Sequence, residues 1–244
     1  MKIFLVGGAV RDSLMGLKPK DLDYVVVLDD INLSVEEGFQ KMRDHLVKEG
    51  FTIWLENPDM FTIRAKFPEG HKFKGDADFV LARKELGYEP DSRRPKLVLG
   101  DIFSDLARRD FTVNAMAEDE DGNIIDPFNG RKDLKRMVLE TPLPAIITFN
   151  DDPLRLMRAF RFNVTKGFKI SGEIYRAMSD KGVTEKFKKV VSQERVREEL
   201  EKMFKHNTIK TLLLLTSANK LLMPELLEIC FSGDMWLKPT TKAK

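Results

Sequence analysis

The sequence has few of the residues that build disulfides, metal clusters or membrane spans. Cys230 is the one cysteine, which excludes an internal disulfide and a cysteine-rich zinc site. No stretch approaches the roughly 18 consecutive apolar residues that suggest a membrane helix. The opening residues MKIFLVGGAVRD reach glycine and charge too soon for a signal peptide. We therefore expect a protein of a reducing, cytoplasmic setting that does not enter a membrane.

Net charge is also small, at +2 over 244 residues. Its distribution is uneven, because acidic residues exceed basic ones over 1–150 and basic residues exceed acidic ones over 151–244. This asymmetry suits a metal and nucleotide site beside a surface for a polyanion such as RNA. A solvated helical surface in the second part explains the same counts, and both interpretations stay open.

Hydrophobic patterning predicts an α+β fold, with strands in the first half and helices after about residue 130. A helix is expected over 34–49, where Ser34 is the N-cap and Glu37 completes a capping box. Strands are expected at 3–6, 24–28, 51–56, 60–67 and 76–83. Helices are expected at 131–139, 151–165, 171–181, 193–205 and 207–231, the last with a break at Pro224. The boundary is expected within 130–150.

The first chemical motif is Asp21-Leu22-Asp23, which leads into the apolar run YVVVL. Residues i and i+2 of a strand point to the same face, so both carboxylates project together. Such a pair suits Mg²⁺, which takes its remaining oxygen ligands from water and substrate phosphates. Taken alone, two acidic residues at this spacing are more often surface charges.

A glycine pair precedes these carboxylates. Gly7-Gly8 lies between an apolar strand and a short helix, where unencumbered backbone and a helix N-terminus can approach a triphosphate. Arg11, one turn into that helix, can reach a phosphate oxygen, or it can form a surface pair with Asp12. The glycine turn, the arginine and the carboxylate pair, taken together, indicate a phosphate and metal site more specifically than any one of them does alone.

Five sequence blocks resemble those of the class II tRNA nucleotidyltransferase and bacterial poly(A) polymerase superfamily. They are LVGGAVRDSLMGLKPKDLDYVVV, RRDFTVNAMA, IIDPFNGRKDL, DDPLRLMRAFRF and SQERVREELEKM. The resemblance implies a polymerase beta-like head with a mixed sheet, followed by an all-helical neck and body. The implied divisions are a catalytic head at 1–140, a neck that recognises the base at 141–205, and a shortened body or tail at 206–244.

The resemblance also assigns roles by position. Asp21 and Asp23 match the metal-binding carboxylates, and Asp78 matches a third catalytic carboxylate, with a strand-edge charge as the alternative. The implied triphosphate contacts are Gly7, Gly8 and Arg11. The implied sugar and phosphate contacts are Arg109, Asp110 and Asn114, and a structural salt bridge is the alternative for Asp110.

Asp152 and Arg155 are the predicted base-reading pair. At i and i+3 on one expected helix, they are neighbours, with one acceptor and one rigid donor fork. The carboxylate can accept from the exocyclic amine of cytosine or adenine, which uracil and guanine replace with a carbonyl. A helix-surface ion pair is the alternative. Arg158 and Arg161 continue along the same helix and are expected to face phosphate or the Asp152 carboxylate.

The resemblance leads us to expect Mg²⁺-dependent addition of C and A from CTP and ATP to tRNA 3′ ends. Asp151 replaces the glutamate usual in its block, and the helical region after the head is shorter than in typical members. With only His45, His71 and His206 in the sequence, we do not expect an added metal-dependent phosphohydrolase domain. An A-adding or C-adding enzyme, a poly(A) polymerase and a non-catalytic RNA-binding descendant remain alternatives, and a homodimer is an open possibility.

Overall fold

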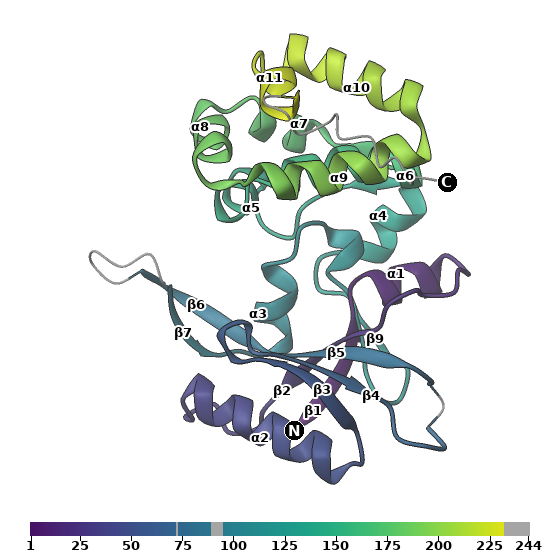
Figure 1. Ribbon diagram of the computed structural model, residues 1–244, viewed down its shortest axis with the longest axis vertical. Coiled ribbons are helices and arrows are strands. Elements are labelled where there is room, and N and C mark those ends of the chain that lie inside the picture. Colours follow the sequence, from purple (N-terminus) through teal and green to yellow (C-terminus); the bar gives the residue numbers. More distant parts are fainter. Residues whose placement is uncertain (72, 89–94, 232–244) are drawn as a thin grey trace, which may run out of the picture. The chain divides into compact units, whose positions relative to one another are not determined.

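The computed structural model describes residues 1–71, 73–88 and 95–231 (Figure 1). The chain divides into two compact units, Met1–Leu134 and Lys135–Lys244. Mixed α and β structure fills the first unit and helices dominate the second, so the predicted α+β fold class is confirmed. The expected divisions at residues 140 and 205 stay predictions.

A seven-stranded mixed sheet forms the centre of the N-terminal unit, in the order β3-β4-β5-β2-β1-β8-β9. Its β2 and β5 strands run parallel, and every other neighbouring pair is antiparallel. The strands are β1 (Lys2–Val6), β2 (Asp23–Val27), β3 (Thr52–Asn57), β4 (Thr62–Lys66), β5 (Asp76–Leu81), β8 (Ala117–Glu118) and β9 (Ile124–Ile125). A separate hairpin of β6 (Arg83–Tyr88) and β7 (Pro95–Leu99) was not anticipated from the sequence.

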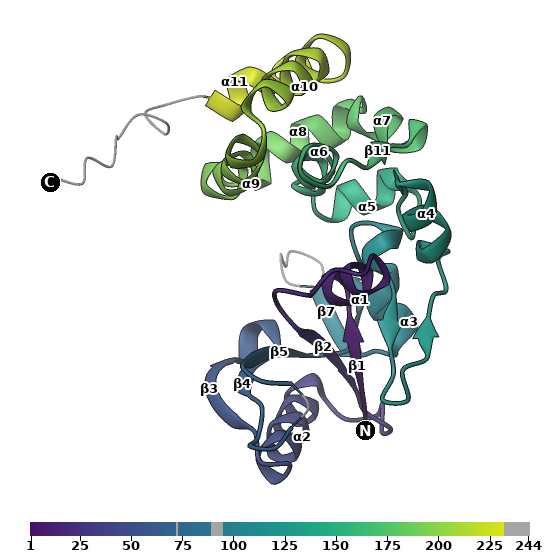
Figure 2. The same ribbon diagram turned by 90° about the vertical axis from the view of Figure 1, so that its right-hand side faces the viewer.

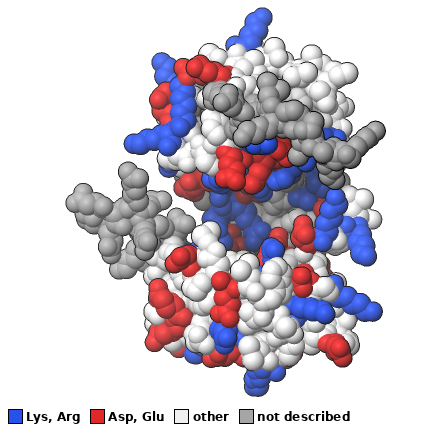
Figure 3. Space-filling view, viewed as in Figure 1, with Lys and Arg blue, Asp and Glu red and all other residues white. Residues whose placement is uncertain are grey.

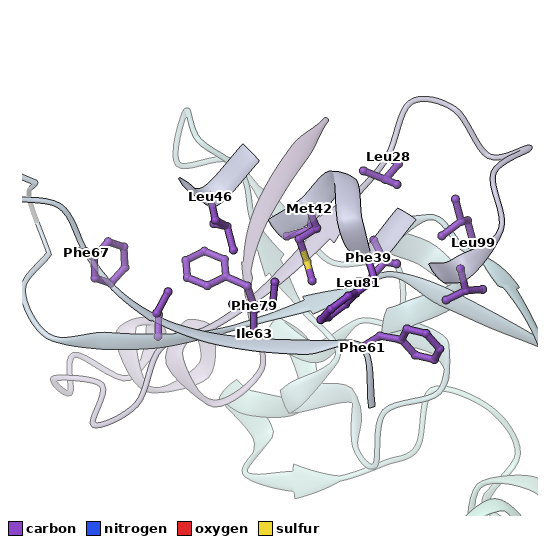
Figure 4. Close-up of a cluster of buried hydrophobic side chains, with 14 residues drawn as sticks. Leu28, Phe39, Met42, Leu46, Phe61, Ile63, Phe67, Phe79, Leu81 and Leu99 are labelled. Carbon is purple, nitrogen blue, oxygen red and sulfur yellow. The ribbon is translucent and has the colours of Figure 1, made fainter. Parts of the chain in front are cut away.

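Helix α2 (Val35–Lys48) covers one face of this sheet. Its predicted capping box is present, since the Ser34 side chain accepts from the Glu37 backbone N–H and the Glu37 carboxylate accepts from the Ser34 backbone N–H. Figure 4 shows the apolar side of α2 facing side chains of the strands, including Leu46 near Phe79. This cluster is the larger core of the unit.

Helix α3 (Ile102–Ala107) lies on the opposite side of the sheet from α2 (Figures 1 and 2). It contributes Ile102 and Leu106 to a second cluster with Val25 of β2. Because side chains alternate along a strand, Val25 and Asp23 point to this face while Tyr24 and Val26 point to the α2 face. Helix α1 (Gly8–Leu14) follows β1, and a 3₁₀ turn, η2 (Thr112–Asn114), precedes β8.

The second unit is a set of helices with one short strand pair. The elements are α4 (Gly130–Arg136, which begins in the first unit), β10 (Val138–Leu139), α5 (Ala145–Asp151), α6 (Arg155–Lys166), β11 (Lys169–Ile170), α7 (Gly172–Met178), α8 (Lys181–Val190), α9 (Gln193–His206), α10 (Thr208–Leu221) and α11 (Leu226–Phe231). The two-residue parallel pair β10–β11 corrects the expectation of an all-helical region. Helix α8 was not predicted, whereas the break at Pro224 is confirmed between α10 and α11.

The helix predicted over 151–165 begins later than expected, because α6 starts at Arg155. Residues 152–154 separate α5 from α6, and Asp152 has an extended backbone, with φ −138° and ψ 100°. Pro153 explains the break, because proline lacks an N–H and disfavours helical dihedrals in the residue before it. In the described part of the chain, no helix has the length and apolar character to span a membrane.

Candidate active site

Two acidic residues lie side by side on the α3 face of the central sheet. Asp23 begins β2 and is paired in register with Asp78 of the parallel strand β5. Partial burial raises the pKa of Asp23, and the negative charges of Asp78 and Asp21 raise it further, against the opposing effects of Arg109 and Arg64. Strand register places Asp23 beside Asp78, whereas Asp21 lies in the bend before β2 and not in the strand, where it was expected from the sequence. A cation near Asp23 would relieve the repulsion among these charges.

The carboxylates fit a metal that needs few protein ligands. Within the described residues, no three His, Cys, Asp or Glu side chains are grouped to hold a metal ion by themselves. Asp21 and Asp23 offer carboxylate oxygens, and both side chains are accessible to solvent. Such ligands suit a cation that keeps bound waters and takes its other ligands from substrate oxygens. The donor set therefore suits an open divalent-metal site better than a closed site in which the protein supplies every ligand.

Asp78 already has a cationic partner, which the sequence did not reveal. The Nε and Nη2 of Arg64 donate to its two carboxylate oxygens at 2.5 Å each. Arg64 lies opposite Asp78 in the antiparallel pairing of β4 and β5. The predicted strand-edge charge is thus a bidentate ion pair, and a role for Asp78 as a metal ligand stays a prediction.

The glycine turn lies between a strand and a short helix, as its sequence predicted. Gly7 has φ 70° and ψ −129°, a conformation that other residues adopt only with strain. Its N–H donates to the Met116 carbonyl at 3.3 Å, which ties the turn to the segment following η2. Helix α1 begins at the next residue, Gly8, so its first N–H groups lie beside the turn.

Arg11 is buried rather than extended into solvent. Its Nε and Nη2 donate to Asp12, at 2.8 and 2.7 Å, and its Nη1 donates to the Asn114 side-chain oxygen. Asn114 in turn donates to Asp110 at 2.8 Å, and the same Asp110 oxygen accepts the Phe111 N–H at 2.9 Å. A buried hydrogen-bond chain therefore connects the glycine-turn block with the RRDFTVNA block.

Arg109 reaches the glycine turn from the end of α3. Its Nε and Nη2 donate to one oxygen of Asp105, at 3.1 and 2.8 Å. The Nη1 atom is so close to Gly7 that a β-carbon there would lie 2.7 Å away. Asp105 is fully buried and also accepts from Arg108 at 2.5 Å, so it holds two consecutive arginines.

Sequence reasoning missed Asp105 although a signal was present. An acid placed three and four residues before Arg108 and Arg109 is a standard helical ion-pair spacing. Arg64, in contrast, had no local signal, because its partner is fourteen residues away on another strand. The structure brings together the predicted residues Gly7, Arg11, Arg109, Asp110 and Asn114 in one region of the first unit.

In the second unit, the predicted base-reading pair is arranged differently from expectation. Asp152 and Arg155 are not on one helix, since α6 begins at Arg155. The Asp152 carboxylate accepts from Arg195 of α9 at 2.8 Å and from the Leu154 N–H at 3.1 Å. Arg155 donates from its Nη1 to the Thr148 carbonyl at 3.1 Å. Base recognition by these two residues stays a prediction.

The remaining arginines of α6 face different partners. Arg161 forms an ion pair with the buried Glu199 of α9, and its guanidinium lies 4.6 Å from the Phe162 ring centroid. Arg158 is half-buried on the same helix. Arg195 and Glu199 were missed as site candidates, although both occur in the block SQERVREELEKM. Of the two partners expected for Arg161, the Asp152 carboxylate is not the one it has, because Arg161 and Asp152 are each paired with a residue of α9; a phosphate contact stays a prediction.

On the face of the N-terminal unit that Figure 3 shows, charge does not by itself mark a site. On the face shown in Figure 3, acidic and basic side chains are interspersed over the N-terminal unit. The features that distinguish the candidate site are the paired carboxylates and the buried hydrogen bonds next to the glycine turn. This combination is suited to holding a cation and an anionic ligand close together.

Comparison with known proteins agrees with this arrangement. The family model described as the poly A polymerase head domain matches residues 3–140. The chain belongs to this family. The match covers the whole set of strands and helices on which the carboxylates and the glycine turn lie.

Curated relatives include the multifunctional CCA protein of Neisseria gonorrhoeae, which is 37% identical over 232 residues, 92% of this chain and 50% of the relative. The CCA-adding enzyme of Buchnera aphidicola is 38% identical over 183 residues, 71% of this chain and 37% of the relative. The chain thus spans about half or less of the length of these relatives.

Solved structures that are similar to this chain carry related names. The CCA-adding enzyme of Bacillus stearothermophilus in complex with CTP superposes with a TM-score of 0.70 at 26% identity, over 91% of this chain and 48% of that one. A tRNA nucleotidyltransferase complexed with a primer tRNA and an incoming ATP analog has a TM-score of 0.67 at 27% identity. The match covers 97% of this chain and 61% of that one.

Proposed function

We propose that this protein is a template-independent nucleotidyltransferase that adds C and A from CTP and ATP to tRNA 3′ ends and releases pyrophosphate. The observation that carries the proposal is the juxtaposition of Asp23 and Asp78 in register on two strands, with Asp21 beside them. Family membership and the names of the relatives, which include CCA-adding enzymes, support the choice of substrate.

Asp21 and Asp23 are proposed to hold Mg²⁺. Both supply hard oxygen donors, and the raised pKa of Asp23, caused first by burial and then by the charges of Asp78 and Asp21, is compatible with a bound cation that would favour its ionised form. When bound, the metal would lower the pKa of the attacking 3′-hydroxyl and neutralise charge on the reacting phosphates. Asp78 is proposed to complete the negative field while Arg64 fixes its position.

The first unit's other residues are proposed to bind and orient the triphosphate. Gly7 and Gly8 leave backbone N–H groups accessible beside the start of α1, and Arg109 brings a guanidinium to the same turn. Arg11 is proposed to act as a positioning residue, because its donors are directed to Asp12 and Asn114. The chain of hydrogen bonds through Asp110 then keeps the turn rigid, which limits the ordering needed when a nucleotide binds.

In the second unit, Asp152 is proposed to accept from the exocyclic amine of cytosine or adenine. Its pairing with Arg195 holds the carboxylate in a defined orientation, while Arg155 is proposed to donate to the base's ring acceptors. Arg158 and Arg161 are proposed to contribute positive charge for phosphate. The expected cytoplasmic setting and a homodimer stay predictions.

An extension assay with purified protein tests the proposal. The primers are a tRNA ending before CCA, a tRNA ending in CC and an unrelated RNA, each with Mg²⁺ and single nucleotides or with CTP and ATP together. We expect CTP to extend the first tRNA and ATP to extend the second, with no extension by UTP or GTP. Extension of only one tRNA would identify an A-adding or C-adding enzyme, and long A tails on the unrelated RNA would identify a poly(A) polymerase.

Two variants connect the activity with the carboxylates. Asp21→Asn and Asp23→Asn should each lower incorporation by a factor of at least a thousand while circular dichroism and the thermal midpoint stay near those of the wild type. Asp76→Asn, at the start of the neighbouring strand β5, is the matched control for loss of one exposed carboxylate. Near-wild-type incorporation by either Asp21→Asn or Asp23→Asn would contradict the metal assignment, and no incorporation by the wild type would favour a non-catalytic RNA-binding protein.

A further inference from the structure

An aromatic cavity lies on the face of the sheet opposite the carboxylates. Its volume is about 320 Å³, near the lower end of the range for small-molecule sites. Tyr24 of β2 and Phe79 of β5 line it, and each is the immediate neighbour in sequence of a carboxylate, Asp23 or Asp78, that points to the α3 face. Because side chains alternate along a strand, the cavity is separated from the carboxylates by the sheet itself.

The walls of the cavity are rings in specific mutual orientations. Tyr24 is stacked on Phe79, with centroids 5.2 Å apart and planes 12° from parallel. His71 is stacked on Phe67, with centroids 4.6 Å apart and planes 14° from parallel. Phe51 meets Phe79 edge-on at 5.1 Å. Figure 4 shows Phe67 and Phe79 on the α2 side of the sheet.

Phe67 and Phe79 are buried, but four other rings of the cavity are not sealed into the core. Tyr24, Phe51, His71 and Phe73 are each half-buried, which leaves part of their surface facing the cavity. The cavity therefore offers neutral aromatic surface in which a ligand can displace water.

Carboxylates surround the same cavity. Glu118, Asp119 and Glu120 follow one another along β8 and the turn after it, and Glu49 lies at the end of α2. Glu118 and Tyr24 are both paired with Leu5 of β1, so they belong to one row across three strands. Asp119 is fixed by hydrogen bonds from the Asn123 backbone N–H at 2.7 Å and its side-chain amide at 3.0 Å.

Among the described lining residues there is no lysine or arginine. With no lysine or arginine among these described residues, the four carboxylates repel phosphates, which separates this cavity from the nucleotide chemistry on the other face. Aromatic faces and carboxylates are the two surfaces that attract a cation with an apolar body. We propose that the cavity binds a small organic cation bearing an alkylated ammonium group.

The proposal does not depend on nucleotidyl transfer, and binding tests it directly. Isothermal titration calorimetry at pH 8 and low salt compares choline with 3,3-dimethylbutan-1-ol, the neutral molecule of the same shape with carbon in place of nitrogen. We expect choline to bind with a dissociation constant in the millimolar range or below, and the alcohol to bind about tenfold more weakly, because it lacks the charge that the rings and carboxylates attract.

Variants locate the binding. Glu118→Gln and Glu120→Gln should each weaken choline binding about two- to fivefold and leave binding of the alcohol unchanged. Glu36→Gln removes an equivalent exposed charge at the other end of α2 and should leave both unchanged. Equal affinity for choline and the alcohol, no choline binding at 20 mM, or unchanged choline affinity in both cavity variants would each overturn the proposal.

Discussion

Gly7 and Arg109 approach so closely that a single β-carbon on Gly7 would lie 2.7 Å from the Arg109 Nη1 atom. The glycine therefore does two things at once. It allows the backbone its positive φ of 70°, and it leaves room for a guanidinium against the turn. Two sequence blocks about a hundred residues apart meet at this contact, and it connects the fold with the proposed triphosphate site.

Replacing this glycine should separate the two effects. Gly7→Ala is expected to cost about 1–3 kcal/mol in unfolding free energy from backbone strain, and to displace Arg109 so that KM for ATP and CTP rises at least tenfold. Gly16→Ala is the control, since Gly16 has a similar φ of 72° and a β-carbon there would meet no atom within 4 Å. Both variants should lose stability, measured by urea unfolding, and only Gly7→Ala should lose nucleotide affinity. Equal KM values in the two variants would contradict a role of the contact between Gly7 and Arg109 in nucleotide binding.

The stability of the first unit should fall at acidic pH in part because Asp105 becomes protonated. Burial opposes its ionisation, but the charges of Arg109 and Arg108 and their hydrogen bonds lower its pKa overall. A lowered folded-state pKa means that Asp105 stabilises the protein above its unfolded pKa of about 3.9, and that this contribution is lost as pH falls through the folded pKa.

Asp105→Asn is accordingly expected to cost about 1.5–3 kcal/mol in unfolding free energy at pH 7, because the negative charge is lost and one of the two oxygens that accept from the arginines becomes an N–H donor. The difference from the wild type should shrink in urea titrations as pH falls below about 4. Asp101→Asn, at the N-cap of the same helix α3, should change stability little, since asparagine caps nearly as well as aspartate. A constant difference between Asp105→Asn and wild type across this pH range would refute the linkage.

Asp152→Asn tests the base-reading role against the ion-pair alternative. Asp152 and Arg195 both retain solvent exposure, so loss of their pairing should cost less than about 1 kcal/mol. If the carboxylate reads the exocyclic amine, the ratio of kcat/KM for CTP over UTP should fall tenfold or more. Asp151→Asn, one residue earlier and exposed, is the matched control and should keep the wild-type ratio. If Asp152→Asn kept the wild-type ratio of kcat/KM for CTP over UTP, the base-reading role would be contradicted and the ion pair with Arg195 would remain as the role of Asp152.

Cys230 should be chemically inert in the folded protein. It is fully buried in α11, and burial raises its pKa to about 12, so at pH 8 only about one thiol in ten thousand is ionised. Titration with a disulfide reagent should show slow modification in buffer and rapid modification of one thiol in denaturant. Modification of native protein at the rate of a free small thiol would contradict this.

Local sequence signals were sufficient for several elements. The Ser34 and Glu37 spacing predicted the start of α2, and Pro224 predicted the break before α11. These features depend on residues within one turn of each other, where hydrogen bonding and backbone restriction act directly. The same local reasoning failed at Asp152, where helical spacing with Arg155 was given more weight than the restriction that Pro153 imposes.

The sequence by itself determined the head fold, the alternation that directs Asp23 and Tyr24 to opposite faces, and the glycine turn before α1. Only the tertiary structure decided which arginine meets which acid. Arg64 pairs with Asp78 across β4 and β5, and Arg161 pairs with Glu199 between α6 and α9. Strand register and helix packing bring these side chains together, and both depend on burial of the whole apolar face, which short-range spacing does not encode.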